Sequence, residues 1–195
     1  GKHLEYKELL SISNNIYKNM DESYNIIRCM MEIQDADEYT YFHCLNVGFY
    51  SMLIGKWLGL SKDDIMNIIQ AGLLHDIGKI RIPTRILNKG SVLTRDEYEV
   101  MKKHTILGYK MVENVEEMNF KVKGAILLHH ERIDGSGYPL GLYREEINLC
   151  TNIIAVADVF DAMTSDRPYK ERVTFLKHKT SLHREAHLID PIRKE

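Results

Sequence analysis

Cysteine, proline and long apolar runs are all scarce in this sequence, and each scarcity excludes a class of protein. The three cysteines, at positions 29, 44 and 150, are odd in number and far apart, which argues against a disulfide framework and favours reduced thiols. No apolar run approaches the roughly 18 residues that a transmembrane helix needs, and no signal peptide is visible. We therefore expect a cytoplasmic protein without membrane insertion. The first residue, Gly1 rather than Met, is consistent with a piece of a longer chain.

An excess of charge of one sign is also missing. The 26 Lys and Arg residues nearly balance the 28 Asp and Glu residues, so the formal net charge is −2. A chain with this balance has no overall electrostatic attraction for DNA or for an anionic membrane. We expect no DNA partner, and any anionic ligand must be held by a local cluster of cations.

Strand-like alternation is rare, whereas apolar residues at helical spacing are frequent. Ser61 with Asp64, and Thr94 with Glu97, have the spacing of capping boxes at helix N-termini. The pattern predicts an all-α fold with one hydrophobic core and a loop with one short turn near residues 82–92. The predicted helices span residues 3–20, 21–33, 38–58, 61–73, 94–111, 120–130 and 147–163.

Five of the nine histidines lie within or at the ends of these apolar helices, namely His43, His75, His104, His129 and His130. A single buried histidine is usually hydrogen-bonded to a backbone carbonyl, so none of the five would indicate a function alone. Two acids change this interpretation. Asp76 directly follows His75, and Asp158 lies in an apolar helix with no Lys or Arg within one turn. Because a buried carboxylate needs a positive partner or a metal, the set indicates a metal centre. Mixed imidazole and carboxylate ligands suit iron, manganese or zinc.

Four motifs that contain these residues occur in a specific order: HDIGK at 75–79, HTILG at 104–108, HHERIDGSGYP at 129–139 and ADVFDAMTSDRPYK at 157–170. The series resembles that of the HD-GYP family, bacterial HD-superfamily phosphodiesterases that hydrolyse cyclic di-GMP. The resemblance covers about residues 41–170. It implies a catalytic domain over residues 37–172, preceded by N-terminal helices (1–36) and followed by an atypical C-terminal tail (173–195). The N-terminal helices are either a linker from a regulatory domain or part of the helical core.

The resemblance also implies how the side chains are used. The fold would be an HD-domain helical bundle with a metal cluster at the junction of its core helices. His43, His75, Asp76 and Asp158 would form one ligand set. His104, His129 and His130 would hold a second metal, with Asp76 bridging the two ions. Asp161 is expected to support a ligand or to cap a helix, without binding metal itself.

The expected cofactors are two divalent ions, iron or manganese first and zinc as an alternative. In three-metal members of the family, a glutamate one turn before the first histidine adds a ligand. Here that position holds Tyr39, and Glu38 is one residue away, which rotates it by about 100° around the helix. The sequence therefore predicts two metals.

The implied function is hydrolysis of cyclic di-GMP to the linear dinucleotide, to GMP or to both, by attack of a hydroxide held between the metals. Asp76 and Lys79 are the expected catalytic residues, and the expected substrate contacts come from Lys79, Tyr138, Arg167 and Lys170. Two alternatives stay open: a hydrolase of another cyclic dinucleotide or nucleotide, and a catalytically weak module that senses a nucleotide or docks a protein. The sequence also leaves open a homodimer and a preceding regulatory domain.

Overall fold

The computed structural model describes residues 10–11, 13–14 and 39–165, and these are entirely helical apart from turns and loops. The all-α prediction is confirmed for this part of the chain. The described residues form no strand, and their β-type pairing is an isolated antiparallel bridge between Asp134 and Tyr143. The two predicted N-terminal helices lie largely outside the described residues. Arg167, Lys170 and the tail lie outside them entirely.

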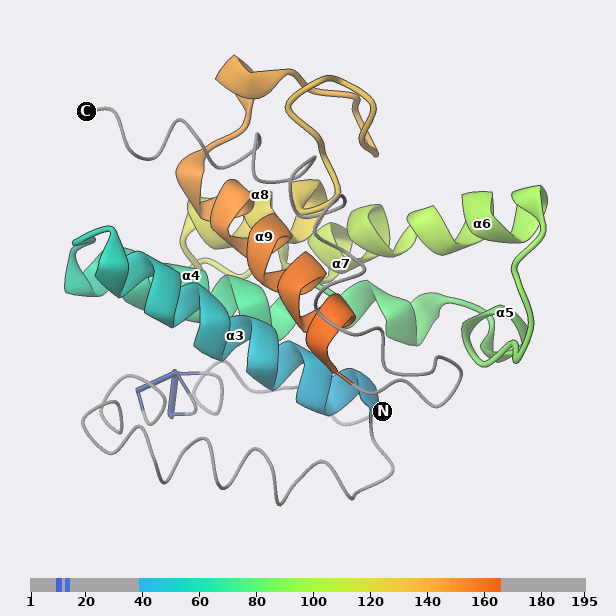
Figure 1. Ribbon diagram of the computed structural model, residues 1–195, viewed down its shortest axis with the longest axis horizontal. Helices are drawn as coiled ribbons and strands as arrows, with labels where there is room; N and C mark the ends of the chain where they lie inside the picture. The colour runs from blue at the N-terminus through green and yellow to red at the C-terminus, as the bar shows by residue number, and fades with distance from the viewer. Residues whose placement is uncertain (1–9, 12, 15–38, 166–195) are drawn as a thin grey trace.

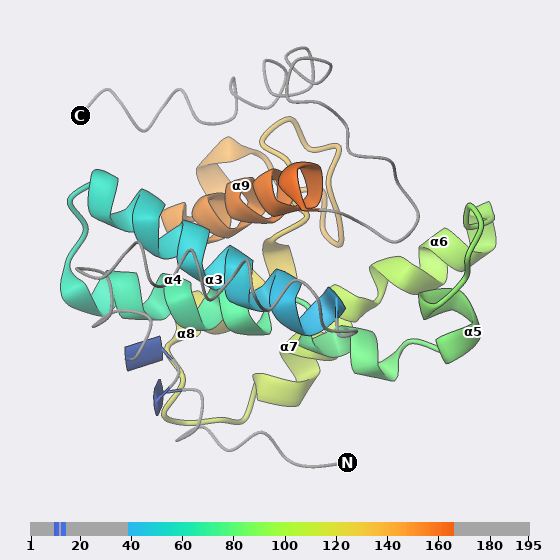
Figure 2. The same cartoon turned by 60° about the horizontal axis from the view of Figure 1, so that its bottom comes forward.

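Figure 1 shows the arrangement of the helices, and Figure 2 shows it from below. A long helix, α3, is followed by antiparallel α4, and α9 packs across this pair from the far end of the sequence. After α4 the chain extends away from these three helices and forms the projecting helices α5 and α6. The bounds are α3 Tyr39–Trp57, α4 Lys62–Leu74, η2 Ile77–Arg81, α5 Thr84–Leu87, α6 Arg95–Lys102, α7 His104–Val112, α8 Phe120–Leu128, η3 Arg144–Glu146 and α9 Leu149–Thr164.

Local sequence explains several of the helix ends. Ser61 caps α4 by accepting the Asp64 backbone amide, and Thr94 with Glu97 forms a reciprocal capping box on α6. Gly59, with φ of +68°, closes the turn between α3 and α4 in a conformation that favours glycine. The expected short turn after η2 is α5.

The predicted single helix over residues 94–111 is wrong, because the chain breaks at Lys103 into α6 and α7. The side chains that follow the break explain it. The His104 imidazole bonds the Met101 carbonyl (2.9 Å), and the Thr105 hydroxyl donates to the Lys102 carbonyl (3.2 Å). Such side-chain bonds compete with the backbone bonds of a continuous helix. Because of the break, His104 is the first residue of α7 and does not lie in the middle of a longer helix.

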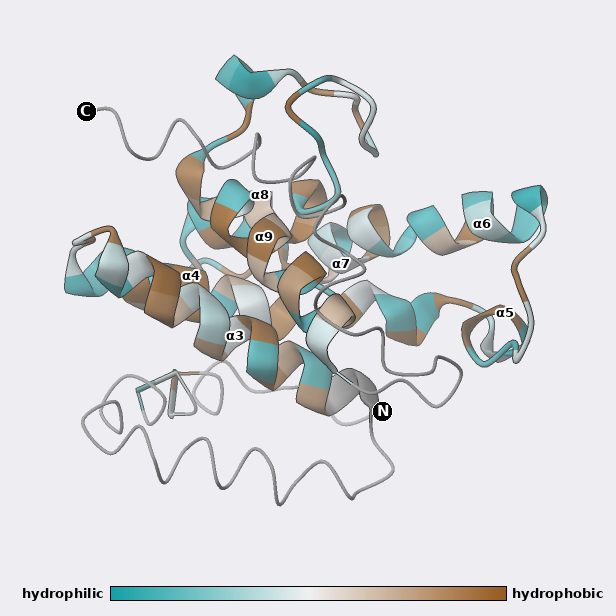
Figure 3. Ribbon diagram, in the orientation of Figure 1, coloured by the Kyte–Doolittle hydropathy of each residue, from teal (hydrophilic) through white to brown (hydrophobic). Residues whose placement is uncertain are grey.

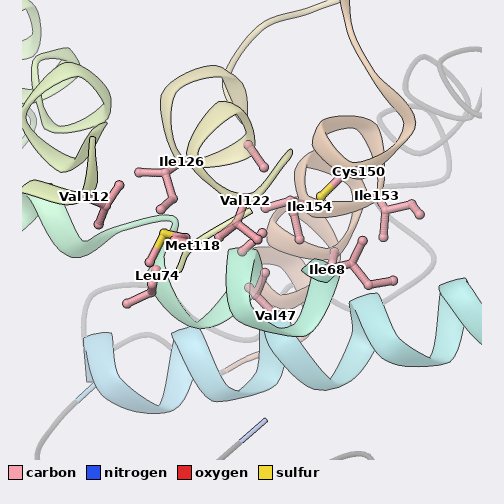
Figure 4. Close-up of a cluster of buried hydrophobic side chains, with 13 residues drawn as sticks. Val47, Ile68, Leu74, Val112, Met118, Val122, Ile126, Cys150, Ile153 and Ile154 are labelled. Carbon is pink, nitrogen blue, oxygen red and sulfur yellow. The ribbon is translucent and has the colours of Figure 1, made fainter. Parts of the chain in front are cut away.

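The hydrophobic core lies between the α3–α4 pair and the α8–α9 pair. Figure 4 shows Val47, Ile68, Val122 and Ile154 pointing toward one another from these four helices. The apolar colouring of Figure 3 follows the same helices, whereas α6 is mostly hydrophilic. Gly48 and Gly72 let α3 and α4 approach closely, since a β-carbon on Gly72 would lie 2.7 Å from the Gly48 Cα atom. This packed frame fixes the helix ends that carry the histidines.

A helix long and apolar enough to cross a membrane does not occur among the described residues.

Candidate metal centre

The seven predicted metal ligands, which come from five helices and their ends, lie together in the structure. His43 is on α3, His75 and Asp76 follow α4, and His104 begins α7. His129 and His130 follow α8, and Asp158 is on α9. The Nε2 atoms of His43 and His75 are 3.3 Å apart, as are those of His104 and His129.

Two trios of potential ligand atoms have no member in common, and a third group, formed by His75, Asp76 and His129, links these two trios. In one trio, the ligand atoms of His43, His75 and Asp158 lie within 4.8 Å of one another. In the other, those of His104, His129 and His130 do so. The Asp76 carboxylate lies between the trios: one oxygen is 3.3 Å from His75 Nε2, and the other is 3.4 Å from His104 Nε2. A single carboxylate therefore faces both groups.

Backbone carbonyls orient three of the imidazoles. The Nδ1 atoms of His75, His104 and His129 lie 2.8, 2.9 and 3.0 Å from the carbonyl oxygens of Gly72, Met101 and Ile126, each three residues earlier in the sequence. A carbonyl only accepts hydrogen bonds, so each Nδ1 carries the hydrogen. In the neutral form of each ring, Nε2 then presents a lone pair to the centre, which is the tautomer that binds metal.

Asp161 orients His43 similarly, through a side-chain carboxylate in place of a backbone carbonyl. Its carboxylate accepts from His43 Nδ1 at 2.6 Å and from the side-chain amide of Asn46 at 2.7 Å. Asp161 is fully buried and also accepts the Ser165 hydroxyl at 2.7 Å. It thus holds the ring from the side opposite the cluster, as metal-ligating histidines are usually held.

Two observations show that this site fits divalent metal ions. First, the His104 and His129 Nε2 atoms face each other without a hydrogen between them, because both Nδ1 atoms carry theirs. Second, the Asp76 Oδ1 atom is buried and has no hydrogen-bond partner. Facing lone pairs and an unpartnered buried carboxylate oxygen are both unfavourable without a cation. A cation bound among them would satisfy both.

Electrostatics divide the cluster into two halves. Burial, with help from neighbouring imidazoles, holds the pKa of His129 well below its ordinary value. Burial also lowers the pKa of His104, and it lowers the pKa of His130 to about 4. These three rings are therefore neutral near pH 7.

The other half of the cluster contains charged pairs. Burial alone would lower the pKa of His75, but the Asp76 charge outweighs it and raises that pKa well above its ordinary value. Burial likewise opposes ionisation of Asp76, but His75 and Lys79 outweigh it and hold the pKa of Asp76 well below its usual range. The same competition, with His43 as the main partner, lowers the pKa of Asp158. Both acids are thus carboxylates, ready to bind cations.

Lys79 and Tyr138, two of the predicted substrate contacts, border the cluster. The Lys79 ammonium donates to Asp76 Oδ2. The Tyr138 ring centroid lies 4.7 Å from that of His130, with the planes tilted by 30°. Burial raises the pKa of Tyr138, so its hydroxyl stays protonated and can donate.

Glu131 is a buried residue of the site that the sequence analysis missed. Its carboxylate accepts the backbone amides of Leu140, Gly141 and Leu142, at 2.5, 3.1 and 2.9 Å. These bonds fasten the end of the loop that carries Tyr138. The sequence did contain a signal for this residue, because Glu131 directly follows the paired histidines.

The tip of this loop is shaped by turn residues. Asp134 accepts the backbone amide and the hydroxyl of Ser136, an arrangement that is typical of a turn. Gly137 is required at its position, because a β-carbon there would overlap the backbone of Glu131 and Arg132. The loop therefore folds back against the segment that follows the paired histidines.

Comparison with known proteins agrees with this site. A family model described as HD domain matches residues 10–192. A cyclic di-GMP phosphodiesterase of Pseudomonas aeruginosa is 41% identical over 147 residues, which cover 75% of this chain and 36% of that protein. The 3′3′-cGAMP-specific phosphodiesterase 3 of Vibrio cholerae is 34% identical over 178 residues, which cover 88% of this chain and 38% of that protein. The chain thus spans well under half the length of these relatives.

A solved structure shares the fold. Bd1817, described as an HDG"Y"P protein from Bdellovibrio bacteriovorus, matches with a TM-score of 0.67 at 19% identity, over 96% of this chain and 70% of that one. The helical fold and its cluster of imidazoles and carboxylates define a domain that binds divalent metals. The chain belongs to the HD domain family, and within it to the HD-GYP group.

Proposed function

We propose that this chain is a metal-dependent phosphodiesterase that hydrolyses cyclic di-GMP. The observation that carries the proposal is the pair of ligand trios that the Asp76 carboxylate faces. Proteins that are 34–41% identical to this chain over most of its length are named as phosphodiesterases of cyclic dinucleotides. The proposed product is the linear dinucleotide, GMP or both.

We assign two divalent ions to the cluster, iron or manganese first and zinc as an alternative. One ion would be held by His43, His75 and Asp158, and the other by His104, His129 and His130, with Asp76 shared. When bound, the ions would activate a water molecule and stabilise the negative charge that develops on the phosphate. The proposed count of two metals rests on the sequence, in which Tyr39 occupies the position one turn before His43 and Glu38 is one residue off that position.

Lys79 is the proposed catalytic cation of the chain itself. Its pKa is raised, because the Asp76 charge outweighs the effect of burial, so it stays an ammonium at neutral pH. From its place on Asp76 it can donate to a phosphate oxygen or to the departing sugar oxygen. Such a fixed donor stabilises charge as it develops and needs no rearrangement during the reaction.

The substrate side of the site is proposed to include Tyr138, Arg167 and Lys170. Tyr138 lies against His130 and near His104, where its ring can contact a base and its hydroxyl can donate to phosphate. Arg167 and Lys170 supply further cations for the phosphates. The cytoplasmic location, a homodimer and a preceding regulatory domain stay predictions.

A cyclic dinucleotide with a different base is the second candidate substrate. The Vibrio cholerae relative, which aligns along most of this chain, is named as specific for 3′3′-cGAMP. Comparing kcat/KM for cyclic di-GMP, 3′3′-cGAMP and cyclic di-AMP separates the candidates. A preference of tenfold or more, about 1.4 kcal/mol, would identify the base that the site selects.

The decisive experiment combines metal analysis with turnover. Protein purified without air is expected to contain about two metals per chain and to hydrolyse cyclic di-GMP. Asp76→Ala is expected to lose both metals and turnover. The matched control is Asp63→Ala, which removes an exposed carboxylate from the first turn of α4. Full metal content without hydrolysis of any cyclic dinucleotide would overturn the proposal and favour a sensing or docking module.

A further inference from the structure

A lysine of α6, which no part of the proposed mechanism uses, is held against the aromatic side of the metal centre. The Lys102 Nζ atom lies 5.5 Å from the ring centroid of Tyr98 and 5.6 Å from that of Tyr138. The two rings meet edge to face, with centroids 6.5 Å apart. An ammonium at this distance from an aromatic face is attracted by the ring, so the pair restrains Lys102.

This cation borders the imidazole trio of the site. Its partner Tyr138 lies against His130, and Lys102 itself comes two residues before His104, across the break between α6 and α7. Lys79, by contrast, is bound to the Asp76 carboxylate. The two lysines therefore have different partners: Lys79 contacts the Asp76 carboxylate, whereas Lys102 contacts the Tyr138 ring that packs against His130.

An ion pair with Glu99 is the ordinary explanation for the position of Lys102. The two side chains are 2.8 Å apart on one face of α6. However, the Glu99 side chain is 55% exposed, whereas that of Lys102 is 26% exposed. A pair this open to solvent is weak, so an arriving anion can replace Glu99. The tyrosines would still hold the lysine in place.

The chemistry of the substrate supplies such an anion. A cyclic dinucleotide has two phosphates, and only one can be hydrolysed in the metal centre at a time. The other remains charged and must lie elsewhere on the surface. Because the chain carries a net charge of −2, it offers no general attraction for that phosphate, and a local cation is needed. Lysine is a common phosphate ligand as a point charge.

We propose that Lys102 binds the second, non-scissile phosphate of the cyclic dinucleotide, with its ammonium positioned by Tyr98 and Tyr138. This assignment rests on the proposed function. It makes α6 part of the substrate site, although that helix projects away from the packed core (Figure 1). It also gives Tyr138 a second role, because its ring orients a cation as well as lining the site.

The test compares two substrates that differ in their number of phosphates. Cyclic di-GMP has two, and bis(p-nitrophenyl) phosphate has one phosphodiester. Lys102→Met is expected to raise KM for cyclic di-GMP about tenfold and to lower the kcat/KM ratio of cyclic di-GMP to the single-phosphate substrate by a similar factor. Lys102→Arg is expected to restore most of that ratio. Lys103→Met, which removes the exposed neighbouring lysine, is the matched control.

Glu99→Gln is expected to change KM in the direction opposite to Lys102→Met. It frees the ammonium of Lys102 and is expected to lower KM for cyclic di-GMP. Equal kinetics for the Lys102→Met and Lys103→Met variants would overturn the assignment, as would an equal loss on both substrates. A wild-type chain with no activity on cyclic di-GMP would count against the proposed function instead. In that case titration calorimetry with cyclic di-GMP tests Lys102, and an equal Kd for the two variants overturns its role.

Discussion

Gly78 packs directly against the backbone of His104, so closely that a β-carbon on Gly78 would overlap the His104 carbonyl oxygen. The same β-carbon would lie 2.5 Å from the Gly108 amide nitrogen. This contact joins η2, which follows His75 and Asp76, to the start of α7. The glycine of HDIGK thus sets the distance between the two halves of the metal centre.

Gly78→Ala is therefore expected to push α7 away from η2 and to separate Asp76 from His104. Overpacking of a close contact typically destabilises a protein by about 1–3 kcal/mol. Thermal unfolding and metal analysis should show a lower Tm and a reduced metal content. Gly124→Ala on α8 is the control, because a β-carbon there would meet only an Asn148 side-chain nitrogen at 3.7 Å. If the two variants have the same Tm and metal content, the contact does not control the site.

Asp161→Asn should weaken metal binding without removing a proposed ligand. The amide offers one acceptor oxygen where the carboxylate serves His43, Asn46 and Ser165. Loss of such an orienting partner typically reduces metal affinity about 10–100-fold. Competition with a fluorescent chelator measures the change. Ser165→Ala, which removes a single donor to the same carboxylate, should have a smaller effect, and equal effects would contradict the special role of the His43 bond.

Glu131→Gln is expected to loosen the loop that carries Tyr138 while leaving the imidazole trio in place. The glutamine nitrogen would confront one of the three backbone N–H groups that the carboxylate now accepts. An unsatisfied buried donor costs about 1–3 kcal/mol. Hydrogen exchange of the Leu140, Gly141 and Leu142 amides should accelerate. Unchanged exchange would show that other contacts hold the loop; Glu146→Gln, at an exposed position, is the comparison.

Lys79→Met should leave the metals bound and slow the reaction. The methionine retains much of the aliphatic stem but removes the ammonium that lies on Asp76. Loss of one fixed donor to developing charge typically reduces kcat by about 10²–10³. Steady-state kinetics and metal analysis separate chemistry from metal loss. Lys110→Met, at an exposed position of α7, should behave as wild type, and normal turnover of the Lys79 variant would remove this lysine from the mechanism.

Removal of the metals by a chelator is expected to destabilise the fold. Without a cation the buried Asp76 Oδ1 atom lacks a partner, and the His104 and His129 lone pairs face each other. Free metal at a hundredfold excess over its Kd stabilises a protein by about 2.7 kcal/mol. For a chain of this size, the corresponding fall in Tm is roughly 5–10 °C. Re-addition of manganese or iron should restore the Tm, and a Tm that is insensitive to both steps would contradict the assignment.

Helical class, several helix ends and the residue types of the site all follow from local sequence. Ser61 and Thr94 cap their helices because the required partners lie within one turn. Periodic apolar residues likewise predicted the core helices, because helix geometry repeats every 3.6 residues. Apolar periodicity did not predict the break at Lys103 between α6 and α7. Apolar periodicity does not register side chains that bond back to the carbonyls of the preceding turn.

Local sequence also identified the seven histidines and acids, although their division into two ligand sets came from family resemblance. Their meeting depends on packing across long separations in the chain. His43 reaches Asp161 across 118 positions, and Gly78 reaches His104 only because α7 lies against η2. The role of Glu131 likewise depends on how the loop turns back on itself. The sequence by itself thus determined which groups could bind metal, whereas tertiary packing decided their distances, their tautomers and which side chains hold them in place.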